Sequence, residues 1–227
     1  DVNNEGPNYI SSLTPDGNSA LVLLGNKYLD KGKMLAGLSI TKKTDSGWTK
    51  PIPVEIEDDY NYSDRANYYL ANTKRALLMS VERSDSQGGR DLYVSFLKED
   101  STWSVPLNLG AVVNTAGEEE APFLAADNES LYFSSNGFPG YGGHDIYVSK
   151  RLDETWTNWS TPQNLGSEIN TNQEDIFFYI PAIGEYAYYS RGITEENSDI
   201  YRVGLPIVKM PTPVLVVTGK LTNSKTG

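Results

Sequence analysis

The chain has 227 residues with 15 Tyr, 4 Trp and 6 Phe, enough for one large all-β core or two smaller domains. Its formal net charge of -11 excludes the basic face that nucleic acid or anionic lipid requires, so we expect neither as a partner. The absence of Cys excludes disulfides and thiolate metal sites, and no apolar run approaches the roughly 20 residues of a membrane-spanning helix. The chain begins at Asp1 without a signal peptide, and we interpret it as a trimmed piece of a larger protein.

Short apolar runs bounded by Gly, Asn and Asp predict β-strands along the whole chain, with no amphipathic helix longer than about a turn. The runs at 20–25, 76–81 and 186–190 are apolar on both faces, as expected of strands buried between stacked sheets. They fall into four repeat units, at about 5–58, 63–118, 119–174 and 175–210. Residues 211–227 are interpreted as a linker and the first strand of a following β-sandwich domain.

Three sequence anchors recur with a period of about 55 residues. Asp-aliphatic-Tyr returns every 54 residues (145 - 91 and 199 - 145), Trp-x-x-Pro returns at a similar interval, and Asn-Thr occurs at 114 and 170. The anchor residues are Asp91, Asp145, Asp199, Tyr93, Tyr147, Tyr201, Trp48, Trp103 and Trp159. Four strands per period predict an all-β fold, a β-propeller of four-stranded antiparallel blades. A β-sandwich is the alternative, but it would not need the same anchors in every unit.

The ends of the repeat region depart from the pattern. The first unit has Leu35 where the others have the Asp, and the fourth unit lacks its outer strand. Residues 1–10 match the end of an outer strand followed by an inner one. We therefore expect the four repeats to belong to a ring of five or six blades.

The repeated Asp is interpreted as a structural latch. Asp145 follows Gly142 and Gly143, which would supply positive φ for a tight turn, and its carboxylate can accept N–H bonds from that turn. The repeated Tyr would pack between blades. A carboxylate ring binding a metal is the alternative, but equivalent positions in separate blades do not converge on one point. No metal or other cofactor is expected.

Several segments resemble a known family. "LTPDGNSALVLLGN", "LYFSSNGFPGYGGHDIYVSKR", the NLG-x-x-(I/V)NT run that follows the Trp-x-x-Pro of Trp103 and of Trp159, and "VTGKLTNSKTG" are similar to the WD-like (TolB-type) propeller repeats of Bacteroidetes envelope proteins of the OmpA family. The resemblance covers residues 5–205 and, more thinly, 214–227. It implies a periplasmic, outer-membrane-associated scaffold that precedes a carboxypeptidase-regulatory-like domain. It implies peptidoglycan binding only through a further domain that this chain lacks.

The resemblance also suggests partners and a modification. Some relatives belong to type IX secretion or gliding machinery, so other envelope proteins are the expected partners. The "DST" at 100–102 resembles the periplasmic O-glycosylation acceptor of Bacteroidetes, with Ser101 as the modified residue.

An enzyme is the competing hypothesis, because propellers host glycosidases with two facing carboxylates. The candidate carboxylates in loops near the channel are Glu5, Glu118, Glu119, Glu120, Glu174 and Asp175. Glu119 and Asp175 occupy matching repeat positions, which favours a structural or solvated role. His144 is the only His, in a Gly-rich loop typical of exposed surface, and no G-x-S-x-G motif occurs. We therefore expect no catalytic residue, although an acidic pair without equivalents in other blades would favour a glycan-cleaving enzyme.

Binding is expected at the loops that share one propeller face, at 25–33, 83–90, 135–144 and 192–198. The candidate partner-binding residues are Tyr28, Phe138, Tyr141, His144, Glu119 and Asp175. Phe138 and Tyr141 either contact a partner or fill a gap between blades. The expected function is a non-catalytic scaffold, with a carbohydrate- or peptide-binding propeller, or a glycan-cleaving one, as alternatives.

Overall fold

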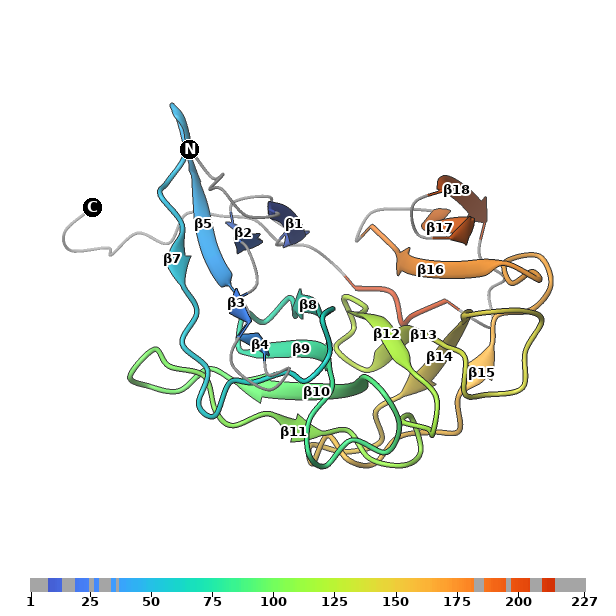
Figure 1. The fold of residues 1–227 in the computed structure, drawn as a ribbon. Coiled ribbons are helices and arrows are strands. Elements are labelled where there is room, and N and C mark those ends of the chain that lie inside the picture. The colour runs from blue at the N-terminus through green and yellow to red at the C-terminus, as the bar shows by residue number, and fades with distance from the viewer. Residues whose placement is uncertain are drawn as a thin grey trace.

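The computed structural model describes residues 8–13, 19–24, 27–28, 34–35, 37–181, 186–194, 197–204 and 210–214. These residues form four small antiparallel sheets, one per repeat, set in chain order along an arc (Figure 1). The prediction of an all-β propeller is confirmed, and the described residues contain no helix. The further blades of a five- or six-bladed ring stay a prediction. No helix in the described part of the chain is long and apolar enough to cross a membrane.

Blade 1 is a five-stranded sheet and blade 2 a four-stranded one. Blade 1 consists of β1 (Asn8–Leu13), β2 (Ser19–Leu24), β5 (Leu38–Thr44), β6 (Gly47–Trp48) and β7 (Ile52–Pro53). Both β6 and β7 pair with β5. A separate two-stranded sheet is formed by β3 (Lys27–Tyr28) and β4 (Met34–Leu35). Blade 2 consists of β8 (Asn67–Leu70), β9 (Ala76–Val81), β10 (Asp91–Phe96) and β11 (Leu107–Asn108).

Blades 3 and 4 repeat the same up-and-down order. Blade 3 consists of β12 (Glu119–Leu124), β13 (Ser130–Ser135), β14 (Asp145–Lys150) and β15 (Gln163–Asn164). Blade 4 consists of β16 (Glu174–Tyr179), β17 (Tyr186–Thr194) and β18 (Asn197–Gly204), and within the described residues no strand pairs with the outer edge of β18. The first strand of each blade contacts that of the next, so β1, β8, β12 and β16 line the inside of the arc.

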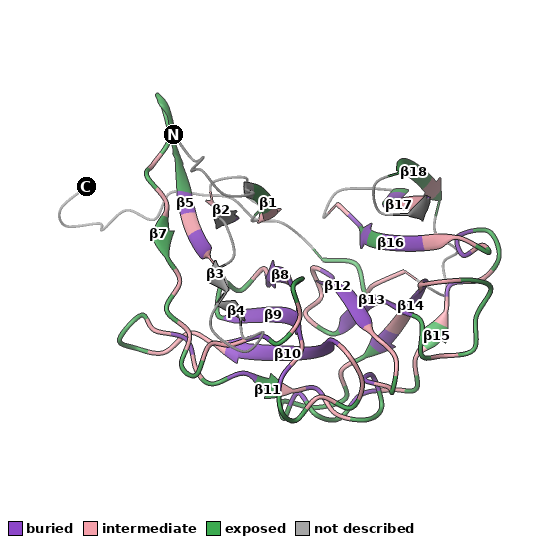
Figure 2. Cartoon of the chain, in the orientation of Figure 1, coloured by how far each residue is buried: buried purple, intermediate pink, exposed green. Residues whose placement is uncertain are grey.

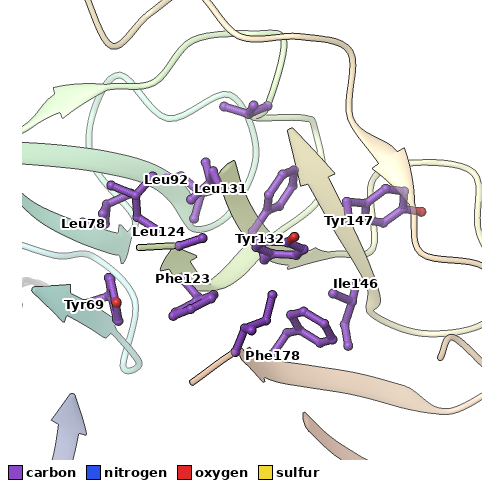
Figure 3. Close-up of a cluster of buried hydrophobic side chains, with 14 of the residues drawn as sticks. Tyr69, Leu78, Leu92, Phe123, Leu124, Leu131, Tyr132, Ile146, Tyr147 and Phe178 are labelled. Atoms are coloured by element: carbon purple, nitrogen blue, oxygen red, sulfur yellow. The ribbon is translucent and has the colours of Figure 1, made fainter. Parts of the chain in front are cut away.

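The core lies between the blades and is most complete in blades 2 and 3, whereas β18 at the edge of blade 4 is largely exposed. Every residue of β9, β12 and β13 is buried, and Figure 2 shows this burial concentrated in blades 2 and 3. In Figure 3, Phe123, Tyr132 and Phe178 lie together, from two neighbouring blades. The ring centroids of Tyr132 and Phe178 are 5.1 Å apart. Such aromatic packing holds adjacent blades face to face.

The repeated Trp does not play the same part in each blade. Trp103 and Trp159 are each 3% exposed and form a β-bridge to the end of their own third strand. Trp48 is instead 40% exposed, because it pairs with Lys43 in a hairpin extending from β5. The repeat anchor at Trp48 therefore lies outside the core.

Blade 4 differs in a similar way at its edge. Tyr93 and Tyr147 are buried, whereas Tyr201 on β18 is 38% exposed and Asp199 is exposed. Residues 211–214, expected to be linker, form no strand, although Thr212 donates its backbone N–H to Asp127. Residues 215–227, where the following domain is expected, lie outside the described residues.

Candidate functional site

The carboxylate of the Asp-aliphatic-Tyr anchor accepts hydrogen bonds from the turn before it. Asp145 Oδ2 accepts the backbone N–H of Tyr141 at 2.6 Å and the side chain of Asn164 at 3.0 Å. Asp91 makes the matching bonds in blade 2, with Gln87 N and Asn108 Nδ2. Burial raises the pKa of both Asp carboxyls. The hydrogen bonds lower it, but burial is the larger effect, so the pKa of each lies above its usual value.

Gly142 and Gly143 were expected to supply a positive φ, but neither has one. Gly142 is instead required for close packing. A Cβ on Gly142 would lie 2.5 Å from backbone atoms of Asn172, in the segment that leads into β16 of blade 4. Any larger residue would therefore push blades 3 and 4 apart.

Glu119 and Asp175 are buried at 0% exposure, so they are not available to a partner at the surface. Glu119 accepts bonds from the backbone and hydroxyl of Thr115 and from Ser135 Oγ at 2.7 Å. Asp175 caps Thr171 in the same way and binds Arg191 Nε at 2.8 Å. Both carboxylates tie the entry of an inner strand to its own blade, which is a structural task.

A cavity of about 730 Å³ lies inside the arc, lined by residues of β1, β8, β12 and β16. Much of its wall is aromatic, including Tyr9, Tyr69 and Phe177. Arg90 and Glu120 bring charge to it, together with Asp64 and Arg65. The cavity thus combines flat apolar surfaces with charged groups, as small-molecule sites do.

A network of charged side chains joins blades 2, 3 and 4 beside this cavity. Arg90 Nη2 contacts Glu118 Oε2 at 3.0 Å and also contacts Glu120. His144 Nδ1 lies 2.7 Å from Glu174 Oε2, and His144 Nε2 lies 3.5 Å from Glu120 Oε1. Burial would raise the pKa of Glu174, but the backbone N–H and ring of His144 outweigh it, so the pKa lies below its usual value.

Two of these ion pairs are the same contact repeated. Arg90 and His144 each precede the anchor Asp, and Glu118 and Glu174 each precede the capping carboxylate, so both pairs join one blade to the next. Glu120 is the exception, because Ile176 occupies the matching position in blade 4. Glu120 is therefore an acidic group that the repeat does not require, and its side chain is only 5% exposed.

Glu118, Glu120 and His144 also place ligand atoms within 4.8 Å of one another, so they could contact a metal ion. The Arg90 guanidinium already touches both carboxylates. Its positive charge opposes a second cation at the same place.

The candidate partner-binding residues do not gather at one surface. Tyr141 is 52% exposed, but Phe138 packs against Tyr147 with ring centroids 5.2 Å apart. The side chain of His144, expected at the exposed surface, is only 12% exposed. The side chain of Tyr28 lies outside the described residues, as does Glu5.

No protein-family model and no curated protein matches the chain. Its fold is similar to that of solved structures. An α-L-arabinofuranosidase from Lactobacillus brevis aligns with a TM-score of 0.54 and 13% identity, covering 89% of this chain and 75% of the other. An α-L-arabinanase from Penicillium chrysogenum, in complex with arabinobiose, aligns at 0.44 with 15% identity over 78% and 65%. The tricorn protease aligns at 0.42 with 11% identity over 89% and 23%.

The match to the arabinofuranosidase corrects two expectations. This finding contradicts the expectations of a non-catalytic scaffold and of a chain that is not an enzyme, because an enzyme is among the solved structures that share this fold. At 13% identity the likeness shows the propeller fold alone. The reaction has to come from the side chains of the cavity.

Proposed function

We propose that the protein is a glycan-cleaving propeller, with its sugar in the central cavity and its nucleophile at Glu120. The observation that carries the proposal is the position of this residue. Glu120 is a buried carboxylate on the cavity wall, and the repeat does not account for it. A glycan is chosen because the shared fold is that of an arabinofuranosidase.

Glu118 and Glu120 are proposed as the pair of carboxylates that cleave the glycosidic bond. Their oxygens approach within 4.8 Å. This favours a retaining reaction, in which the two carboxyl groups stand about 5–5.5 Å apart. Arg90 pairs with Glu120, as an ionised nucleophile requires, while the side chain of Glu118 is 41% exposed and within reach of water.

The bonds change in two steps. Glu120 attacks the anomeric carbon while the glycosidic C–O bond breaks and Glu118 gives its proton to the leaving oxygen. Glu118 then takes a proton from water, which displaces Glu120 and restores both carboxyl groups. The sugar leaves with its original anomeric configuration.

The test is hydrolysis of a panel of aryl glycosides, with α-L-arabinofuranoside included, and of arabino-, xylo- and cello-oligosaccharides. Glu120→Gln should lower kcat by about 10²–10⁴-fold while oligosaccharide binding persists. Glu129→Gln, an exposed residue in the turn before β13, is the matched control and should leave kcat unchanged. Absence of turnover across the panel, or equal turnover by Glu120→Gln and wild type, would overturn the proposal.

We infer also that the protein is exported to the periplasm and associates with the outer membrane. The TolB-type repeat resemblance and the absence of Cys support this location. Ser101 lies in an exposed turn, as a glycosylated serine would. Fractionation of the native cell tests the location, and a mass change abolished by Ser101→Ala tests the modification; protein in the cytoplasmic fraction would refute it.

A further inference from the structure

One repeat position in blades 3 and 4 faces the cavity. Ala121 and Phe177 are separated by 56 residues (177 - 121), each lies where the register of its inner strand shifts, and both line the cavity wall. Blade 3 thus places a methyl group where blade 4 places an aromatic ring.

The backbone at this position is held in an unfavourable conformation. Ala121 has φ 49° and Phe177 has φ 60°, each inside a bulge where the register with the second strand shifts. The left-handed region disfavours every residue with a Cβ, and bulky ones most. Blades 3 and 4 share the bulge, so the bulge is a feature of the repeat. The large side chain at position 177 is not, because blade 3 has alanine there.

Packing does not explain the ring. Ala121 is 8% exposed, whereas Phe177 is 51% exposed, and no aromatic ring in the described part of the chain packs against it. Its neighbour Phe178 turns into the core at 2% exposure. A strained residue that displays an aromatic face to a cavity indicates a ligand contact.

We propose that Phe177 is a ring-stacking residue of the cavity, holding the apolar C–H face of a sugar ring; this rests on the proposed function. Strand β16, which carries Phe177, contacts β12, which carries Glu120. In the repeat, position 177 is one residue beyond the position of Glu120. The flat face therefore lies on the strand next to the acidic group, where a sugar could stack on one wall and react at the other.

The experiment separates affinity from stability and from turnover. Binding of arabino-, xylo- and cello-oligosaccharides of two to four sugars is measured by isothermal titration for wild type, Phe177→Ala, Phe177→Gly and Phe177→Trp. Phe177→Ala should raise the dissociation constant about three- to tenfold, and Phe177→Trp should leave it unchanged. Tyr62→Ala is the control, since Tyr62 is 44% exposed but lies outside the cavity lining, and it should leave affinity unchanged.

Stability should move in the opposite direction. Phe177→Gly should raise Tm by about 2–4 °C, because glycine adopts positive φ without strain. An unchanged dissociation constant for Phe177→Ala, a lowered Tm for Phe177→Gly, or a wild type that binds none of the oligosaccharides would overturn the inference. Binding that depends on Phe177 without hydrolysis would refute the proposed function alone, and hydrolysis with a KM unaffected by Phe177→Ala would refute this inference alone.

Discussion

Replacing Asn114 by alanine tests whether this side chain acts as an extra piece of backbone. Strand β11 ends at Asn108, and the Asn114 amide then continues the pairing along β10. Its Oδ1 accepts the N–H of Leu92 at 2.8 Å, and its Nδ2 donates to the carbonyl of Leu92 at 3.0 Å and to Asn108 Oδ1 at 2.8 Å. Asn114 is 1% exposed, so water cannot replace these bonds.

The expected loss follows from what remains after truncation. The Leu92 carbonyl keeps the N–H of Leu109 at 3.0 Å, but the Leu92 N–H is left buried without its acceptor. An orphaned buried donor costs about 1–3 kcal/mol, and each of the other two bonds contributes about 1 kcal/mol. Asn114→Ala should therefore lower the free energy of unfolding by about 4 kcal/mol, and Tm by roughly 8–16 °C.

Thermal and urea unfolding followed by circular dichroism measure this loss. Asn170→Ala should cost a similar amount, because Asn170 makes the same three bonds to Ile146 and Asn164. Gln163→Ala on the exposed part of β15 is the control and should change stability by less than about 0.5 kcal/mol. If both asparagine variants have the same Tm and urea midpoint as the Gln163→Ala control, the asparagine side chains do not complete the sheets as described.

Three further predictions concern packing, charge and pH. Trp159→Ala should cost about 3–5 kcal/mol by leaving a core cavity, whereas Trp48→Ala, at the same repeat position but 40% exposed, should cost far less in urea unfolding. Arg90→Met should destabilise by about 3–5 kcal/mol because it removes the arginine partner of the buried Glu120 carboxylate, and adding Glu120→Gln should recover part of the loss; additive effects would contradict the pairing. Burial raises the pKa of Asp127, but hydrogen bonds from Ser130 and its neighbours outweigh burial, so the pKa lies below its usual value. The ionised Asp127 therefore stabilises the fold at neutral pH, and this contribution disappears as the pH falls below about 4 and through the pKa of the folded state. The Tm gap between wild type and Asp127→Asn should accordingly shrink between pH 7 and pH 3, and a constant gap would refute this assignment.

The blades were predictable because the residues that make them repeat in the sequence. Asp145 accepts N–H bonds from its own turn, and Asn170 pairs with the adjacent strand, so each motif encodes a contact within one blade. Such local contacts depend little on the rest of the chain, and a period of about 55 residues reveals them.

Contacts between blades were not predictable in the same way. His144 lies in a Gly-rich segment that is typical of exposed surface, yet packing of blade 3 against blade 4 brings it to Glu174. The burial of Glu120 and the positive φ of Phe177 also depend on strand pairing and blade packing, which no residue pattern reports. The expected scaffold role rested on a family resemblance, and the comparison with solved structures corrected it.

The inner-strand bulge has a consequence for how such a protein can change. At positions 121 and 177, blades 3 and 4 each offer one side chain to the same cavity, while the hydrogen bonds that define each blade lie elsewhere. The cavity wall can thus be altered one blade at a time without rebuilding the sheets. A combinatorial library restricted to these two codons would vary the shape of the cavity on an unaltered framework.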